Sequence, residues 1–294
     1  MADSDKMNFG GPWSGQKLDA LRRYLTSYTT ALSNKSFKLA YIDAFAGAGV
    51  QERDGSEDAW FSEEFAAEEE RYRSGSPLIA LETDPAFDAF IFIEQNTASI
   101  QALREQIQQR WGSGQRQIAY LQGDANQHLA DLTRKNWTRH RAVAFLDPFA
   151  LQVSWATLER IAQTQAIDTW LLFPAMAVNR MLPKSGEIPS AWADRLSVLF
   201  GESGWRDVFY HSEGTDLFGD EPLRKVDRIF DRLSDYVTAR LGTISAGTTD
   251  KPLVLRNRGG APLFLLCFAC GNPKGAGIAT RIASHIIDKT GHGK

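Results

Sequence analysis

The chain has 294 residues, of which 43% are hydrophobic and 23% are charged. This balance is typical of a globular protein and excludes a disordered or fibrous chain. The formal charge of −3 argues against strong, sequence-independent binding of nucleic acid, which needs many Lys and Arg residues, although a local basic face stays open. We expect 1–294 to form one domain that carries insertions.

In chain order, the sequence first predicts a helix over 19–32, where apolar residues recur at helical spacing, and then a strand over 38–42. The following segment, 51–75, is polar and acidic, and we expect it to be a surface excursion. The residues "GSP" place a capping serine before a proline, which predicts the start of a helix that runs over 76–87.

Strands and helices then alternate, which indicates a parallel sheet covered by helices on both faces. The predicted strands lie at 90–93, 117–121, 141–146 and 169–173, and the predicted helices between them lie at 98–111, 126–137 and 155–164.

The alternation stops after the fifth strand. We interpret 175–243 as a helical insertion with one long helix at 222–241. An antiparallel pair, 253–256 and 263–270, and a last helix at 276–289 close the chain. The predicted fold class is α/β: a Rossmann-like sheet of the class I methyltransferase type, mostly parallel, with an antiparallel edge pair and an N-terminal helix.

The longest apolar run, 263–269, is far shorter than the roughly 18 residues that span a bilayer. The first residues, MADSDKMNFG, lack the apolar core of a signal peptide. We therefore expect a cytoplasmic protein with no membrane association.

Two cysteines, Cys267 and Cys270, have a C-x-x-C spacing that is open to a redox or zinc interpretation. They lie in "LFLLCFACGNP", a predicted strand, on which a spacing of three points the side chains to opposite faces. A redox pair is expected at a helix N-terminus, and a zinc site needs two further ligands. We therefore expect core cysteines and no metal site.

The loops after the first four predicted strands carry acidic residues, two of them with glycines beside the acid. Ligands of such sheets bind outside the carboxyl ends of the strands, where the strand order reverses. These loop residues are Asp43 with Gly47 and Gly49, then Glu94, then Gly123 with Asp124, and finally Asp147 with Pro148 and Phe149.

This row of residues suits S-adenosylmethionine as a cofactor. Gly47 and Gly49 let the backbone approach a ligand with no Cβ in the way. A carboxylate at Glu94 can accept hydrogen bonds from both ribose hydroxyls, and Asp124 can accept a hydrogen bond from the adenine amino group. A pyrophosphate would be repelled by so many carboxylates, and the third glycine of G-x-G-x-x-G is absent, which disfavours a nicotinamide dinucleotide.

Each signal also has a structural alternative. The glycine loop is equally consistent with a tight turn between a strand and a helix. Glu94 alone fits a solvated strand end, and Asp124 alone fits a turn or cap residue. Only the joint occurrence of these residues in strand order favours a nucleoside cofactor.

The segment "AFLDPFAL" follows the strand that faces the methyl donor in this architecture. Asp147 can accept a hydrogen bond from an amine, Pro148 would fix the turn and aim its carbonyl, and Phe149 can stack on a flat substrate. Methyltransferases of exocyclic amines carry D-P-P-Y or N-P-P-Y here. The second proline is missing in this chain, so the substrate stays open, as does a role for Asp147 as a helix cap.

A set of motifs that spans nearly the whole chain resembles the three-Cys-motif partner proteins (TcmP). The motifs are W-S-x-x-K-L (Trp13, Ser14, Lys17, Leu18), "YIDAFAGAG", "GSPLIAL", "FIFIE", "GDAN", "AFLDPFAL" followed by Trp155, and a late "GNPKG". The resemblance implies a class I S-adenosylmethionine-dependent methyltransferase-like fold. It also implies a partner among the radical-SAM proteins that carry three cysteines.

Carried over by position, the resemblance makes the loop from Phe45 through Ala46 to Gly49 the methionine-side contact. It makes Glu94 the ribose ligand, Asp124 with the adjoining Ala125 the adenine ligand, and Asp147 the active-site candidate. The cysteines for which the family is named belong to the partner.

The leading functional hypothesis is a methyltransferase (EC 2.1.1 class) that acts on an amine or another nucleophile, with nucleic acid among the open substrates. Catalysis would come from in-line positioning, with Asp147 or its neighbouring carbonyl orienting the amine. The alternative is a cofactor-binding accessory of a radical-SAM partner that transfers no methyl group itself. A nucleotide-dependent oxidoreductase is a third, less favoured hypothesis.

Overall fold

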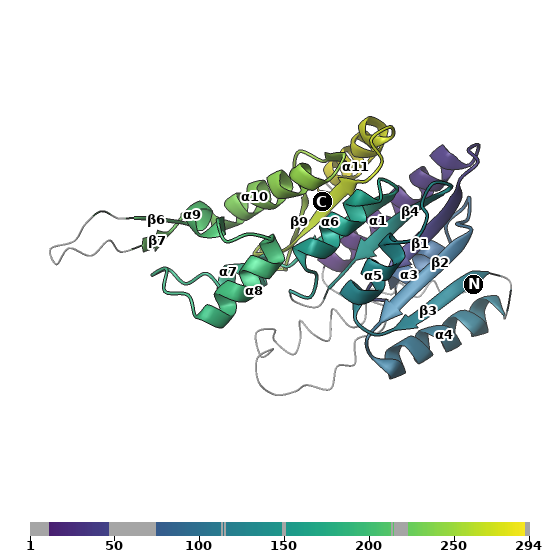
Figure 1. Cartoon of the computed structure of the whole chain (residues 1–294), viewed down its shortest axis with the longest axis horizontal. Helices are drawn as coiled ribbons and strands as arrows, with labels where there is room; N and C mark the ends of the chain where they lie inside the picture. Colours follow the sequence, from purple (N-terminus) through teal and green to yellow (C-terminus); the bar gives the residue numbers. More distant parts are fainter. Residues whose placement is uncertain are drawn as a thin grey trace, which may run out of the picture.

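The computed structural model describes residues 12–46, 75–112, 114, 116–148, 151–212, 214 and 223–291. Within them, an eight-stranded sheet forms the centre of the molecule (Figure 1). Its strands run in the order β3-β2-β1-β4-β5-β10-β8, and β9 also pairs with β10. The strands are β1 (Lys38–Asp43), β2 (Ala89–Glu94), β3 (Gln117–Gln122), β4 (His140–Leu146), β5 (Ile167–Phe173), β8 (Gly247–Thr248), β9 (Leu253–Arg256) and β10 (Pro262–Cys270).

The first five strands of this sheet are parallel, whereas β10 runs antiparallel to β5, β8 and β9. The strand order reverses between β1 and β4, which are neighbours although β2 and β3 separate them in sequence. The predicted fold class, a mostly parallel α/β sheet with antiparallel edge strands, is therefore confirmed. Such a reversal point is where open α/β sheets bind their ligands.

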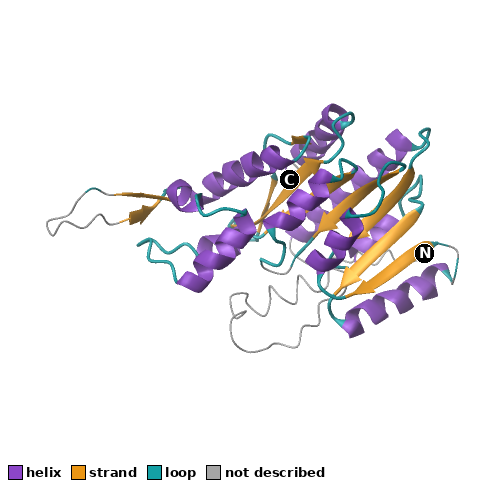
Figure 2. Ribbon diagram, in the orientation of Figure 1, coloured by secondary structure: helices purple, strands orange, loops and turns teal. Residues whose placement is uncertain are grey.

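Helices cover both faces of the sheet (Figure 2). Along β4, Val143 and Phe145 join one hydrophobic cluster while Ala142 and Ala144 join the other, as the alternation of strand side chains requires. The helices of the first face are α1 (Pro12–Leu32), α3 (Gly75–Leu81), α4 (Thr97–Trp111) and α11 (Ala276–Gly291). Those of the second are α5 (Ala125–Thr133), α6 (Trp155–Gln163), α7 (Ala175–Arg180), α8 (Ser190–Phe200), α9 (Trp205–Phe209) and α10 (Ile229–Ile244).

The predicted helices and strands are present in this order, and their ends differ in two informative places. Helix α1 begins at Pro12 rather than at 19, since a proline suits the first helical position. The prediction started later because Gly15 interrupts the amphipathic pattern. Helix α3 ends at Leu81 rather than at 87. The residue before Pro85 disfavours helical backbone, so the helix stops ahead of it.

The 175–243 region contains a feature that the sequence analysis missed, a two-stranded sheet of β6 (Tyr210–Ser212) and β7 (Leu223–Lys225). It projects from one end of the molecule (Figure 1). The long helix therefore starts at Ile229, not at 222. Lys225 holds β7 in place, because its Nζ donates to the Asn179 Oδ1 and to two backbone carbonyls at 2.6–2.9 Å.

Cys267 and Cys270 lie on β10 and are buried in opposite hydrophobic clusters, as predicted. Burial raises the pKa of both thiols above the ordinary value. None of the helices formed by the described residues is long and apolar enough to cross a membrane. The described residues also place no group of three His, Cys, Asp or Glu side chains where a metal ion would fit.

Candidate functional site

The loops that follow β1, β2, β3 and β4 meet at the carboxyl edge of the sheet. The Ala44 N–H donates to the Phe145 carbonyl on β4 at 3.1 Å, and the Ala46 N–H donates to the Ile93 carbonyl on β2 at 2.9 Å. The Gly123 N–H donates to the Glu94 carbonyl at 3.0 Å. These bonds bring the predicted residues Asp43, Phe45, Ala46, Glu94, Asp124, Ala125 and Asp147 to one edge.

Three predicted site residues, Gly47, Gly49 and Phe149, lie outside the described residues, as does 51–74 of the acidic excursion. Their predicted roles stay predictions. The site described here is built from the ends of the strands and from helix α1.

A buried ion pair joins the N-terminal helix to the end of β4. The Lys17 Nζ on α1 donates to the Asp147 Oδ2 at 2.6 Å, and the two side chains are 0% and 3% exposed. The same ammonium lies 5.4 Å from the centre of the Trp13 ring. Because both charges are removed from water, each depends on the other for its stability.

Asp147 also has a buried oxygen that the described residues leave unused. Its Oδ1 has no hydrogen-bond partner among them, and neither has the buried Ser14 hydroxyl one helical turn before Lys17. A buried acceptor without a donor is costly, so native proteins rarely keep one without a reason. Asp147 follows β4, and Ser14 lies on α1, the helix whose Lys17 pairs with Asp147. Their unused polar atoms are consistent with a partner from outside the chain.

Asp43 is fully buried at the end of β1. The Tyr41 hydroxyl donates to its Oδ2 at 3.0 Å, and the Ser76 hydroxyl at the start of α3 also hydrogen-bonds to the carboxylate. Burial raises the pKa of Asp43 to about 7, while the two hydroxyls oppose the rise and the nearby charge of Asp147 adds to it. Asp43 therefore changes its charge near neutral pH.

Glu94 and Asp124 both make local hydrogen bonds to the backbone. The Asn96 N–H donates to the Glu94 Oε1 at 2.8 Å. Asp124 is exposed and caps helix α5, because its Oδ1 accepts from the Gln127 N–H at 2.9 Å. A cap uses one of several acceptor positions of a carboxylate, so these bonds are compatible with the predicted ribose and adenine roles.

Gly123, which precedes Asp124, needs to be glycine. Its φ is 137°, and a Cβ there would lie 2.9 Å from the His128 Nε2. That imidazole nitrogen is in turn 2.9 Å from the Gln122 carbonyl. The loop after β3 is thus held in a backbone conformation that side chains rarely adopt, close to the end of β2.

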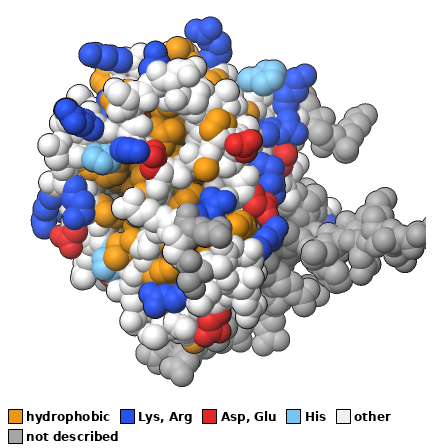
Figure 3. Space-filling view, turned by 90° about the vertical axis from the view of Figure 1, so that its right-hand side faces the viewer, with side chains coloured by type: hydrophobic (Ala, Val, Ile, Leu, Met, Phe, Trp, Pro, Cys, Tyr) orange, Lys and Arg blue, Asp and Glu red, His pale blue; other side chains and the backbone are white. Residues whose placement is uncertain are grey.

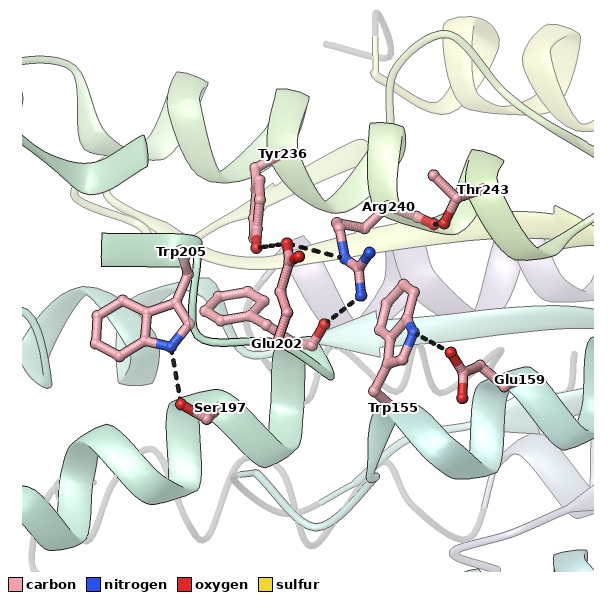
Figure 4. Close-up of polar contacts among 9 residues, drawn as sticks. Trp155, Glu159, Ser197, Glu202, Trp205, Tyr236, Arg240 and Thr243 are labelled. Atoms are coloured by element: carbon pink, nitrogen blue, oxygen red, sulfur yellow. Dashed lines mark hydrogen bonds and ion pairs between the residues drawn. The ribbon is translucent and has the colours of Figure 1, made fainter. Parts of the chain in front are cut away.

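On the other side of Asp147, the chain packs tightly against the 175–243 region. Pro148 lines an apolar cavity of only about 10 Å³ together with residues of β5, α6, α8 and α10. Figure 4 shows the polar network beside it: the Arg240 guanidinium lies 4.5 Å from the Trp155 ring and donates to the Phe200 carbonyl at 2.8 Å. Tyr236 and Arg240 both contact the Glu202 carboxylate.

Figure 4 shows two further hydrogen bonds: Trp155 donates to Glu159 within α6 at 3.1 Å, and Trp205 on α9 donates to Ser197 on α8 at 3.1 Å. The Asn179 side chain, a polar residue after β5, is engaged by Lys225. These contacts hold the region after β5 in place beside the site. Among the described residues, the cavity that Pro148 lines here is too small for a substrate.

No site role was predicted for Ser14, Lys17 or Tyr41, and Ser76 was predicted only as a helix cap. Helix α3 begins at Gly75, and the Ser76 hydroxyl hydrogen-bonds to Asp43 instead. Ser14 and Lys17 belong to the W-S-x-x-K-L motif, where a lysine on an otherwise apolar helix face was the available signal. Tyr41 lies two residues before Asp43, so both point to the same side of β1.

Among solved structures, the chain is similar to protein LPL1258 from Legionella pneumophila, with 15% identity and a TM-score of 0.36 over 64% of this chain and 75% of that one. It is also similar to yhhF, a candidate methyltransferase from Escherichia coli, with 13% identity and a TM-score of 0.27 over 69% and 83%. A candidate sarcosine dimethylglycine methyltransferase from Galdieria sulphuraria has 9% identity and a TM-score of 0.31 over 92% and 79%.

No family model and no curated protein matches the chain. The resemblance to the three-Cys-motif partner proteins therefore depends on the sequence motifs alone. The fold assignment depends on the strand order of the sheet itself, since similarities of this size carry no argument about residues or activity.

Proposed function

We propose that the protein is a methyltransferase that uses S-adenosylmethionine. The observation that carries the proposal is the placement of Asp147: it follows β4 at the reversal of the strand order, is buried, and keeps one carboxylate oxygen without a donor among the described residues. A polar substrate or cofactor group bound at this edge would supply that donor.

In this proposal, the residues at this edge would contact separate parts of the cofactor. Glu94 at the end of β2 would accept the ribose hydroxyls, and Asp124 with Ala125 would contact the adenine. The backbone of Phe45 and Ala46 would lie along the methionine part. The structural support is the proximity of these loops, together with a Gly123 position that a side chain would obstruct.

When bound, S-adenosylmethionine supplies an electrophilic methyl group on a sulfonium. The protein then has to bind the acceptor, orient it and exclude water. The Asp147 Oδ1 would accept a hydrogen bond from an N–H of the acceptor and so aim its lone pair at the methyl group. Lys17 fixes the carboxylate through Oδ2, which leaves Oδ1 as the acceptor atom.

The first test is binding. Calorimetry with S-adenosylhomocysteine, NAD and ATP should show saturable heat with S-adenosylhomocysteine alone. Binding of NAD or ATP in its place would contradict the proposal.

The variant Asp147→Asn tests the role of this carboxylate, and Asp168→Asn is its matched control. Both residues are buried acids, and Asp168 lies on β5, where both its oxygens have partners.

The second test is transfer. Labelled methyl groups should enter one fraction of a cell extract, and Asp147→Asn should abolish this transfer while S-adenosylhomocysteine binding stays nearly unchanged. If the wild type binds the cofactor product, labels no fraction and co-purifies with a radical-SAM protein that carries three cysteines, the accessory role is the correct one.

A further inference from the structure

A second pocket lies at the opposite edge of the molecule, where helix α4 ends and strand β3 begins. Arg104, Gln108 and Trp111 form one wall, at helical spacing on α4. Arg116, which directly precedes β3, and Tyr120 on β3 form the other wall. Ile107 and Ile118 form an apolar floor. The cavity measures about 200 Å³. That is smaller than the roughly 300 Å³ at which pockets for drug-sized ligands begin, so it suits one planar ring.

Arginine and aromatic side chains alternate around this pocket. The Arg104 guanidinium lies 4.8 Å from the Tyr120 ring centre at one end. At the other end, the Arg116 guanidinium lies 5.8 Å from the rings of both Trp111 and Phe90. A guanidinium that stacks on a ring is held flat, and its other side and its edges are suited to a base and a phosphate.

Both arginines that line the pocket lack a carboxylate partner among the described residues. At the rim, Arg110 pairs with the Glu82 carboxylate. For Arg104 and Arg116, in contrast, no carboxylate among the described residues lies within ion-pair distance. The pocket therefore combines an apolar floor with two cationic walls, which favours a ligand that is planar and anionic.

Further Lys and Arg residues lie along the amino edge of the sheet, before β1 and β4. The turns 33–38 and 134–141, which lead into β1 and β4, contain six Lys and Arg residues and no Asp or Glu. The turn 82–88, which leads into β2, contains three Asp and Glu and no Lys or Arg. A further stack joins the turns before β1 and β4, with the Arg141 guanidinium 4.0 Å from the Phe37 ring.

Figure 3 looks onto this end of the molecule. Lys and Arg side chains surround areas where hydrophobic side chains reach the surface. The strand register places Lys38 beside His140, and neighbouring strands lie roughly 4.8 Å apart. The basic turns before β1 and β4 are therefore adjacent, whereas the acidic turn before β2 separates them from the pocket at β3.

We propose that the α4–β3 pocket binds single-stranded nucleic acid, with one base stacked in it and the adjoining phosphates at Arg104 and Arg116. Bases stack on aromatic and guanidinium planes without regard to sequence, and Lys and Arg follow the backbone. The site is independent of methyl transfer, since its residues lie at the edge opposite Asp147. The net charge of −3 limits the affinity to a few phosphate contacts.

The test is fluorescence anisotropy of the full-length protein with a labelled ten-nucleotide oligouridylate. We expect saturable binding that weakens with salt, with a slope that corresponds to about two phosphates, or roughly −1.4 on logarithmic axes. The double variant Arg104→Ala/Arg116→Ala should bind at least tenfold more weakly. Arg104→Lys/Arg116→Lys keeps the charge and loses the planar stack, so its affinity should fall between the two.

Arg206→Ala is the matched control, because Arg206 stacks on Trp205 at 4.8 Å but lies on α9, away from the pocket. It should bind the oligonucleotide as the wild type does. Circular dichroism shows whether the double variant is folded, and Trp111→Phe gives a second, milder change in the same pocket, with the ring retained.

The proposal is wrong if the folded Arg104→Ala/Arg116→Ala variant binds oligouridylate as tightly as the wild type, or if the wild type does not bind it. It is also wrong if polyglutamate competes as effectively as the unlabelled oligonucleotide. In that case the pocket recognises acidic protein segments by charge alone.

Discussion

Helix α1 crosses the sheet and contacts a buried aspartate at each edge, and the two contacts differ. Near the amino edge, the Tyr24 hydroxyl donates to the Asp168 Oδ2 at 2.7 Å and the Gly271 N–H donates to its Oδ1 at 3.1 Å, so both oxygens have partners. At the carboxyl edge, Lys17 satisfies one oxygen of Asp147, and the other has no partner among the described residues.

The comparison separates an anchor from a site. Lys17 and Tyr24 are seven residues apart, two helical turns on one face, so one helix serves both edges. At Asp168 the donors are neutral, and each carboxylate oxygen has one. These bonds fix the helix, and no oxygen is left for a ligand. At Asp147 the donor is a cation, and an acceptor is left over. Unpartnered buried atoms also occur elsewhere among the described residues, at Trp170 and Thr290. We therefore infer a functional edge at Asp147 from its unpartnered oxygen together with its position after β4.

The largest expected effect comes from Lys17→Met. It leaves the Asp147 carboxylate buried without its cation, and breaking such a pair costs about 3–5 kcal/mol. The unfolding free energy, measured in urea, should fall by that amount. The double variant Lys17→Met/Asp147→Asn removes both charges and should recover most of the loss. An additive double variant would show that the two side chains do not depend on each other.

Asp43 gives the next effect, and it depends on pH. Its pKa is about 7 in the folded protein against an ordinary 3.8, so between about pH 4 and 7 the folded state binds more protons than the unfolded state. The unfolding free energy therefore falls as the pH rises through this window, by up to about 4 kcal/mol.

Asp43→Asn keeps the size of the side chain and removes the titration. Urea denaturation of the variant at several pH values should show a much smaller decrease between pH 4 and 7 than the wild type does. Equal slopes in the two proteins would mean that the carboxyl group is already ionised in the folded state at acidic pH.

Tyr24→Phe tests the anchor. It removes one of the two donors to Asp168, which is buried and has a pKa raised chiefly by burial, and a buried acceptor without its donor costs about 1–3 kcal/mol. The unfolding free energy should fall by this amount. S-adenosylhomocysteine affinity should not change, since the contact lies at the other edge. A loss of affinity comparable to that of a site variant would remove the distinction between anchor and site.

The fold was largely predictable from the sequence because its strands are short apolar runs between amphipathic helices. That pattern reports burial on both faces. The exceptions are β6 and β7, which have no apolar pattern of their own. Lys225 holds β7 through contacts with the end of α7 and with Leu182, 43–46 residues away, and no local signal predicts such contacts.

The site was predictable in part for the same reason. Asp43, Glu94, Asp124 and Asp147 follow strand ends, and parallel strands bring their carboxyl ends together, so order along the chain was enough to group them. Lys17 lies 130 residues from Asp147. Their pairing depends on the angle at which α1 crosses the sheet, and periodicity predicts the buried face of a helix but not what that face meets.

The smallest effect on stability should come from Ser14→Ala. The Ser14 hydroxyl is buried with no hydrogen-bond partner among the described residues, so deleting it removes an unsatisfied group instead of a bond. The unfolding free energy should change by less than about 1 kcal/mol in either direction. Cofactor affinity or turnover should nevertheless fall, because in the proposed site the hydroxyl, like the Asp147 Oδ1, would form a hydrogen bond with the bound ligand. The contrary outcome is a variant with unchanged stability, S-adenosylhomocysteine affinity and methyl transfer. It would show that an unpartnered buried atom near this edge does not indicate the site. The inference drawn from Asp147 would then depend on the position of that residue alone.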